Sequence, residues 1–202
     1  MLSSDSSAPV TVVEGMPGAG KTTVLAALAE AGRTVLPEYT TPAGHIMEHD
    51  RHPHHDDEDS HLANWLRKAD HLRGHPGPVW VDRDWLTALA WAASTGGLAR
   101  RSDWVYRHLA TGRLIPPHRW IILDLPPPLS LQRRADRLHP GHPWSDPTVL
   151  ERLRAFYLDP PTHLATAHPG LAELVAAVPR QRVDATASTD QLAGAVDAVG
   201  TR

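Results

Sequence analysis

Residues 15–22 of this 202-residue chain, GMPGAGKT, match the spacing G-x-x-x-x-G-K-[ST] and constrain the fold more than any other feature. The motif follows an apolar run, Val10 to Val13, and precedes a segment whose apolar residues recur with helical spacing. Glycines let backbone N–H groups curl around an anion, and the N-terminus of a following helix adds a positive dipole end. The strand–loop–helix context therefore predicts a loop that binds the phosphates of a nucleoside triphosphate.

Within this loop, Lys21 can reach the β- and γ-phosphates, and the hydroxyl of Thr22 can hold Mg²⁺. No base-reading motif is legible, so ATP is the default nucleotide. The residues expected to contact it are Gly15, Pro17, Gly18, Ala19, Gly20, Lys21, Thr22 and Thr23.

Composition excludes several classes of partner. A net charge of −3 gives no electrostatic footprint for a nucleic acid. Cysteine is absent, which excludes disulfides and thiolate metal sites and fits a reducing compartment. No apolar run reaches membrane-spanning length, and the N-terminus lacks the order of a signal peptide. We expect a cytoplasmic protein with a small-molecule partner and no membrane or nucleic-acid partner; a homodimer stays open.

Apolar runs alternate with helical patterns along the chain. Strands are expected at 10–14, 34–36, 78–82, 120–124 and 182–184. Helices are expected from the phosphate loop to Gly32 and at 61–72, 84–93, 102–110 (Ser102 as N-cap), about 129–138, 147–158, 170–177 and 189–199. This alternation predicts an α/β fold in which helices cover both faces of a parallel sheet.

One domain is expected to span residues 1–202. Within it we expect a disordered N-terminus over 1–8, a flexible His- and Asp-rich loop on the acceptor side over 40–59, and a lid over 133–146. The chain has 19 prolines, and those in the second half are expected to divide it into short connections, among them residues 126–128 and 160–161.

Four polar or loop residues fall at the carboxyl ends of the expected strands, where parallel sheets bind ligands. They are Gly15, Glu38, Asp82 and Asp124. Asp82 can hold Mg²⁺ or its waters, and the guanidinium of Arg83 suits phosphate oxygens. Glu38 can accept a proton from an acceptor hydroxyl or help to place the metal. The structural alternatives are a strand-end salt bridge for Asp82 and Arg83 and a turn cap for Glu38.

Arginines cluster on the helix expected at 129–138. Arg133 and Arg137 lie four residues apart and therefore share a helix face, with Arg134 beside them. Such arginines can neutralise charge during phosphoryl transfer. Arg152 and Arg154 are weaker candidates for this role, and a solvated basic helix is the alternative.

The order of these motifs resembles the thymidylate kinase and deoxynucleoside kinase group of phosphate-loop kinases. The residues that carry the resemblance are 13–23, Pro37-Glu38, Val81-Asp82-Arg83, Leu123-Asp124 with Arg133 and Arg137, and Val183-Asp184-Ala185. The resemblance implies a five-stranded parallel sheet in the order 2-3-1-4-5 and an arginine-bearing lid built around residues 133–137. It also implies that Asp82 and Arg83 lie near the acceptor and Mg²⁺, and that residues 185–188 lie against the nucleotide base.

Two departures bear on the acceptor. Thymidylate kinases usually carry an arginine before the glutamate, where this chain has Pro37, and that arginine grips the phosphate of the acceptor. Residues 40–59 also differ from the glycine-rich stretch of that family. We therefore expect a kinase acting on a hydroxyl of a nucleoside or nucleoside-like compound, which could be an antibiotic, with Glu38 as the base. A nucleoside monophosphate kinase is the alternative.

The acceptor pocket is expected between Glu38 and the helices at 61–72 and 84–93. Aromatic faces stack on planar ligands, so tryptophans of these helices could line the pocket, although core packing is the alternative for each. The candidates are Trp65, Trp85 and Trp91, with Asn64, Lys68 and Arg73 for polar contacts.

Histidines and acids crowd the segment between residues 45 and 61. They are His45, His49, His52, His54, His55 and His61, with Asp50, Asp56, Asp57, Glu58 and Asp59. Imidazole and carboxylate suit Zn²⁺ or Ni²⁺, although a solvated loop over the acceptor is the alternative. A metal-handling GTPase would use these histidines, but the guanine-reading N-K-x-D motif is absent. A nucleotide-sensing module without transfer activity is a third reading.

Overall fold

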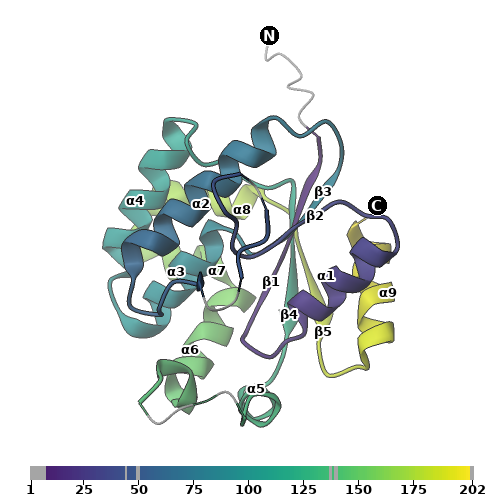
Figure 1. Ribbon diagram of the computed structural model, residues 1–202. Helices are drawn as coiled ribbons and strands as arrows, with labels where there is room; N and C mark the ends of the chain where they lie inside the picture. The colour runs from purple at the N-terminus through teal and green to yellow at the C-terminus, as the bar shows by residue number, and fades with distance from the viewer. Residues whose placement is uncertain (1–7, 44, 49–50, 137, 139–140, 201–202) are drawn as a thin grey trace.

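The computed structural model describes residues 8–43, 45–48, 51–136, 138 and 141–200 (Figure 1). Its strands are β1 (Val10–Gly15), β2 (Val35–Leu36), β3 (Val79–Asp82), β4 (Arg119–Asp124) and β5 (Arg180–Asp184). Its helices are α1 (Lys21–Glu30), α2 (Glu58–Arg73), α3 (Trp85–Thr95), α4 (Leu98–Ala110), α5 (Pro127–Arg133), the 3₁₀ helix η2 (Pro143–Ser145), α6 (Pro147–Leu158), α7 (Pro160–Ala167), α8 (Pro169–Ala177) and α9 (Thr189–Gly200).

The five strands form one sheet in the order β2-β3-β1-β4-β5. Every neighbouring pair is parallel, and β1 at the centre is buried at all six positions. A parallel strand buried on both faces needs apolar residues on both sides of the pleat, which is why β1 is a nearly continuous apolar run. The predicted fold class and strand order are confirmed.

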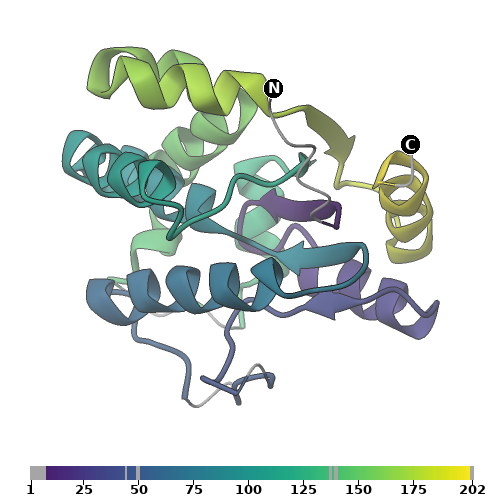
Figure 2. The ribbon, with the colours of Figure 1, turned by 90° about the horizontal axis from the view of Figure 1, so that it is seen from above.

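Helices cover both faces of the sheet. Figures 1 and 2 show α1 and α9 on one face of the sheet. The other face is covered by a larger group of helices, α2, α3, α4, α6, α7 and α8. Successive residues of a strand point to opposite faces, so Val13 packs with α1 and α9 while Val12 packs in the larger core. Trp120 and Ile121 divide between the two cores in the same way. The carboxyl ends of β1 and β4 meet near α1 and α5, which places the candidate site at that edge.

Three helix boundaries differ from the sequence prediction by three residues or more. α2 begins at Glu58, because the side chain of Asp57 accepts a hydrogen bond from Ser60 N and caps it. α4 begins at Leu98, so Ser102 is a buried residue inside the helix and not its N-cap. α5 ends at Arg133, five residues earlier than expected.

Helix α7 is absent from the sequence prediction, in which Pro160-Pro161 indicates a connection. In the structure Asp159 caps α7, and prolines occupy its first positions. Proline is favoured at the first helical position because its missing N–H would be unsatisfied there anyway. Prolines also begin α5, α6 and α8, so several of them start helices in the second half of the chain.

The described part of residues 40–57 crosses the site edge with one isolated bridge, between Thr40 and Ile46. None of the helices in the described residues is both long and apolar enough to cross a membrane. The prediction for the N-terminus, residues 1–8, lies outside the described residues except for Ala8.

Gly15, where β1 enters the phosphate loop, gives a test of this packing. Its φ is 139°, and a Cβ there would lie 2.5 Å from Leu123 O in β4. We expect Gly15→Ala to lower the free energy of unfolding by roughly 2–4 kcal/mol, because backbone strain and overpacking add. Urea denaturation measures the change. Gly74→Ala is the control, because nothing lies within 4 Å of its added Cβ and its φ is −94°. Equal losses in the two variants would contradict the proposed close contact of β1 with β4.

Candidate active site

In the phosphate loop, the Lys21 side chain folds back and binds backbone carbonyls of the loop itself. The Nζ atom of this buried side chain donates to Gly15 O at 3.0 Å and to Met16 O at 2.8 Å. Burial, and then the nearby Arg83 guanidinium, lower the pKa of Lys21 to about 7. Helix α5 holds the loop from outside, because Ser130 Oγ donates to Pro17 O at 2.7 Å. The described loop therefore has the Lys21 side chain at its centre.

The predicted loop residues differ in their exposure. Gly15, Pro17, Ala19 and Lys21 are buried, Gly18 and Gly20 are half-buried, and Thr22 and Thr23 are exposed.

Thr22 and Asp82 lie together at the end of the loop. Thr22 Oγ1 donates to Asp82 Oδ2 at 3.0 Å, which joins the start of α1 to the end of β3. Asp82 Oδ1 is buried and has no hydrogen-bond partner among the described residues. Burial, and then the Glu38 carboxylate, raise the pKa of Asp82. A hydroxyl beside a buried carboxylate with an unused oxygen fits a hard divalent cation such as Mg²⁺.

Arg83 turns inward from the end of β3. Its φ of 63° is the only left-handed value of a non-glycine residue among those described. Its Nε lies 3.0 Å from Glu38 Oε1, and its Nη1 lies 3.7 Å from Glu14 Oε2. Non-glycine residues held in this region are strained, and the strain persists only where the surroundings determine the conformation. Arg83 therefore forms a salt bridge, which was the structural alternative, and it also lies beside the phosphate loop, where its Nη1 donates to Gly15 O.

Glu14 was missed by the sequence analysis, although it is the single charge within an apolar strand. It is fully buried next to the first glycine of the loop. Its carboxylate accepts hydrogen bonds from Asp84 N at 3.0 Å, from Thr87 Oγ1 at 2.8 Å and from Tyr157 Oη at 3.0 Å. An acid within a buried strand needs such hydrogen-bond partners. That requirement is the signal by which the sequence could have indicated Glu14 as a residue of the site.

Glu38 is held from two sides. Arg83 binds its carboxylate, and Asn64 Nδ2 donates to its backbone carbonyl at 2.8 Å. Burial alone would raise the pKa of Glu38, but Arg83 first and then Lys21 and Lys68 hold it below its ordinary value. The carboxylate is therefore charged, and its side chain is 28% exposed.

Lys68 and Asn64 are candidates for polar contacts with the acceptor. In the structure both side chains donate hydrogen bonds to backbone carbonyls of the site. Lys68 Nζ donates to Asp82 O at 2.6 Å and to Arg83 O at 2.8 Å. Burial lowers the pKa of Lys68 to about 8. Arg73, in the last turn of α2, donates instead to the carbonyls of Gly112 and Arg113.

Arg133 and Arg154, two of the arginines predicted to act in phosphoryl transfer, contact different parts of the chain. Arg133 Nη1 donates to Gly18 O at 3.3 Å and to Ala185 O at 2.9 Å, so it links the phosphate loop to the segment after β5. Arg137 lies outside the described residues, and because α5 ends at Arg133 the argument from a shared helix face does not hold. Arg154 pairs with Asp124 at 2.7 Å, and Arg152 is exposed.

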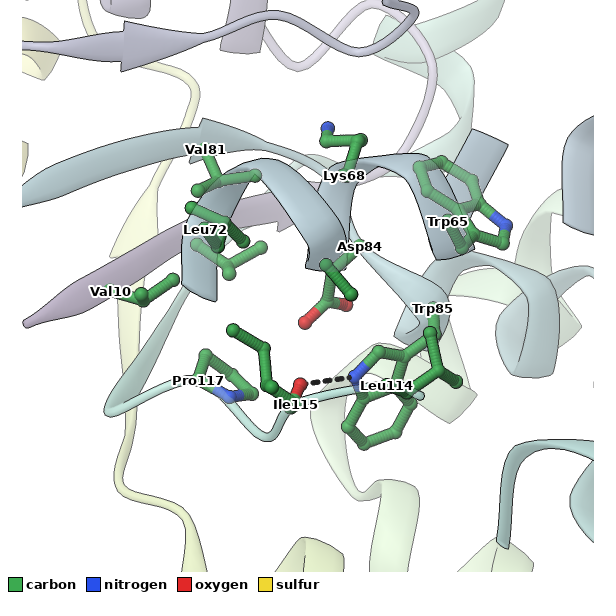
Figure 3. A pocket seen from close by; sticks show the side chains of 12 residues that line it. Val10, Trp65, Lys68, Leu72, Val81, Asp84, Trp85, Leu114, Ile115 and Pro117 are labelled. Atoms are coloured by element: carbon green, nitrogen blue, oxygen red, sulfur yellow. Dashed lines mark hydrogen bonds between the residues drawn. The ribbon is translucent and has the colours of Figure 1, made fainter. Parts of the chain in front are cut away.

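Two of the predicted pocket tryptophans belong to the core. Trp65 and Trp85 line a small cavity of about 20 Å³ beneath α2, room for a single water molecule (Figure 3). In Figure 3 the Asp84 carboxylate points into this cavity, whereas Nζ of Lys68 points away from it. Trp91 is half-buried and meets Trp144 edge-to-face at 6.0 Å.

The hydroxyl of Tyr157 tests the buried network. Tyr157→Phe removes the donor to Glu14, and we expect it to lower the free energy of unfolding by about 1–3 kcal/mol. Urea denaturation of this variant is compared with Tyr106→Phe. The Tyr106 ring packs on His168, and its hydroxyl has no hydrogen bond among the described residues. A loss as large in the control, or none in Tyr157→Phe, would contradict the role assigned to this hydroxyl.

Comparisons with solved structures show which known proteins share this fold. The deoxyadenosine kinase from M. mycoides with bound dATP superposes with a TM-score of 0.64 at 12% identity, over 96% of this chain and 100% of that chain. The same enzyme with the products dCMP and a flexible dCDP gives 0.60 at 12% identity, with the same coverage. The YorR protein from Bacillus subtilis, in complex with phosphorylated GDP, gives 0.52 at 13% identity over 94% of each chain. These likenesses confirm the predicted resemblance to phosphate-loop kinases at the level of the fold.

Sequence comparison gives one positive result. No curated protein matches the chain. A family model described as AAA domain matches residues 10–143, a segment that contains the phosphate loop, Glu38, Asp82 and Arg133. Since the match spans well over half of its length, the chain belongs to the AAA domain family.

Proposed function

We propose that this protein is a Mg²⁺-dependent kinase that transfers the γ-phosphoryl group of ATP to a hydroxyl of a nucleoside or nucleoside-like compound. One observation carries the proposal: the charged carboxylate of Glu38 is fixed by Arg83 at the same sheet edge as the phosphate loop. A base of this kind beside a triphosphate site is the arrangement that hydroxyl phosphorylation needs. The fold shared with a deoxyadenosine kinase supports a nucleoside as acceptor.

The donor would be held by the loop. The amides of residues 15–22 and Lys21 would bind the β- and γ-phosphates, for which Lys21 exchanges its carbonyl partners. Thr22 and Asp82 would hold Mg²⁺, which when bound neutralises phosphate charge. Arg133, which already contacts Gly18 O, would add a second cation over the phosphates, and Arg137 is proposed for the same role.

The acceptor would lose its proton to Glu38. The acceptor oxygen forms a bond to the γ-phosphorus, the bond from that phosphorus to the β–γ bridging oxygen breaks, and ADP leaves. The hydroxyl proton passes to Glu38 Oε2 or Oε1. Arg83 keeps this carboxylate ionised and oriented before the transfer, because burial by itself would favour its neutral form.

The charges around Glu38 favour a hydroxyl over a phosphate as the acceptor group. A monophosphate needs a cation that is ready to bind it. Arg83 already serves two carboxylates, and Lys68 donates to backbone carbonyls. Pro37 stands where the phosphate-gripping arginine of thymidylate kinases would stand.

A phosphoryl-transfer screen tests the acceptor class. We expect a mass increase of one phosphoryl group on a nucleoside or nucleoside-like antibiotic, and none on nucleoside monophosphates of the dTMP type. The screen covers nucleosides, monophosphates and aminoglycoside-like compounds with ATP and Mg²⁺, and products are identified by mass spectrometry. Transfer to monophosphates alone would establish the alternative acceptor, and ATP binding without transfer to any compound would favour a nucleotide sensor.

Glu38→Gln tests the proposed base. We expect kcat to fall by about 10²–10⁴-fold while ATP affinity changes little, because the amide cannot accept the proton. Steady-state kinetics with the best acceptor and ATP-binding calorimetry give the two values. Glu48→Gln, an exposed acid of the same segment, is the matched control. An equal loss of ATP binding in Glu38→Gln would mean that Glu38 serves the nucleotide and not the acceptor.

A further inference from the structure

We propose that the hollow between α6, α8 and β5 is a binding site for a small molecule that carries a phosphate or carboxylate group beside an apolar part. Its volume is about 300 Å³, the lower end of the range for small-molecule sites. The residues that line it include Ile122, Tyr157, Leu158, Val178, Arg180 and Arg182. The site lies outside the residues assigned to phosphoryl transfer and goes beyond the proposed function.

Two arginines of β5 line the hollow from the same face of the sheet. β5 is the outer strand (Figure 1), and its Arg180 lies opposite Trp120 of β4. Arg182 lies opposite Ile122. Paired residues of neighbouring strands point to the same face, and Trp120 and Ile122 belong to the larger core. Both arginines therefore lie at the rim of that core, on the face that α6 and α8 cover.

The guanidinium of Arg182 supplies a positive charge that the protein itself uses little. Its Nε lies 3.8 Å from Asp124 Oδ2, beyond hydrogen-bond distance, and the side chain is 67% exposed. Asp124 is already bound by Arg154, whose Nε and Nη2 donate to its two oxygens at 2.7 and 3.1 Å. The nearby Asp184 accepts a hydrogen bond from Thr186 N at 2.9 Å. Among the described residues the Arg182 guanidinium has no hydrogen bond, so its planar fork can bind an oxyanion.

Arg180 adds a second positive charge, which the end of α8 holds in place. Its Nη1 donates to Val175 O at 2.7 Å. Burial lowers the pKa of Arg180, and the Asp159 carboxylate acts in the opposite direction, so the charge is only partly compensated. Among the described residues that line the hollow, the charge is carried by Arg180 and Arg182. The lining therefore favours an anion.

The rest of the lining is largely apolar. Ile122, Tyr157 and Val178 are buried, and Leu158, which is 39% exposed, extends this surface toward solvent. The Tyr157 hydroxyl is turned to the other side, where it donates to Glu14 next to the phosphate loop. A ligand with its anionic group on the arginines and a ring on this apolar surface would match both parts of the lining. Charged side chains on an edge strand also discourage pairing with another chain, but that role needs no hollow.

The test is an NMR titration of the full-length chain with phenyl phosphate, in a buffer without nucleotide. We expect saturable shifts of the backbone amide signals of Ala176, Val178 and Arg182, which line the hollow. Phenylacetate is titrated in parallel, because arginine binds both phosphate and carboxylate, and the tighter of the two probes identifies the anionic group. Shifts at Gly18 and Gly20 report any binding to the phosphate loop separately, so the result is independent of whether the protein is a kinase.

Three variants locate the binding. Arg182→Gln should weaken it by about 10-fold or more, because a charged hydrogen-bond donor is lost. Ala176→Trp, which fills the hollow and keeps both arginines, should abolish it. Arg152→Gln, which removes an exposed arginine of α6 outside the hollow, should bind as the parent does.

Four results would overturn the proposal. They are the absence of saturable shifts in the lining with either probe, unchanged affinity in Arg182→Gln, binding that survives Ala176→Trp, and inorganic phosphate binding as tightly as phenyl phosphate. The last would mean that the apolar part of the lining contributes nothing. Urea denaturation of each variant shows that it folds, so a loss of binding is not a loss of structure. Arg182 is exposed, so its variant keeps the test decisive even if Ala176→Trp fails to fold.

Discussion

The site depends on the ion pairs that the buried guanidinium of Arg83 forms with the carboxylates of Glu14 and Glu38. Arg83 joins the end of β3 to β1 and to the segment after β2. A buried arginine cannot lose its proton, so its charge must be matched by carboxylates and hydrogen bonds. Removing one partner of such a group leaves an uncompensated buried charge, which costs far more than the intact pair contributes. Glu14 and Glu38 therefore have to be positioned together.

The other residues of the site hold Arg83 and Glu14 in place. Tyr157 of α6 and Thr87 of α3 fill the remaining acceptor positions of Glu14, so two helices of the larger core are tied to the phosphate loop. Lys68 of α2 binds the carbonyl of Arg83 and helps to hold its left-handed backbone. Trp65, one turn earlier in α2, anchors that helix in the core. The apolar packing and the polar network thus support the same few residues.

The balance of charge at this edge has a consequence for ligand binding. Arg83 and Lys68 are already satisfied within the protein, and Lys21 is bound to loop carbonyls with a lowered pKa. An incoming triphosphate would bring several negative charges that these groups only partly offset. A divalent cation at Asp82 and the exposed Arg133 would supply the remaining positive charge, which fits the buried, unpartnered oxygen of Asp82 among the described residues.

The sequence by itself determined the phosphate loop, the parallel sheet, and the placement of Glu38, Asp82 and Arg83 at its carboxyl edge. These follow from local spacing and from the alternation of strands and helices, which a chain carries without reference to distant residues. Only the tertiary structure decided that Arg83 folds inward, that Glu14 is its partner and that Lys68 supports the backbone. The physical reason is that each of these contacts joins residues far apart in the chain. Tyr157 and Glu14, for example, meet only after α6 has packed against the sheet.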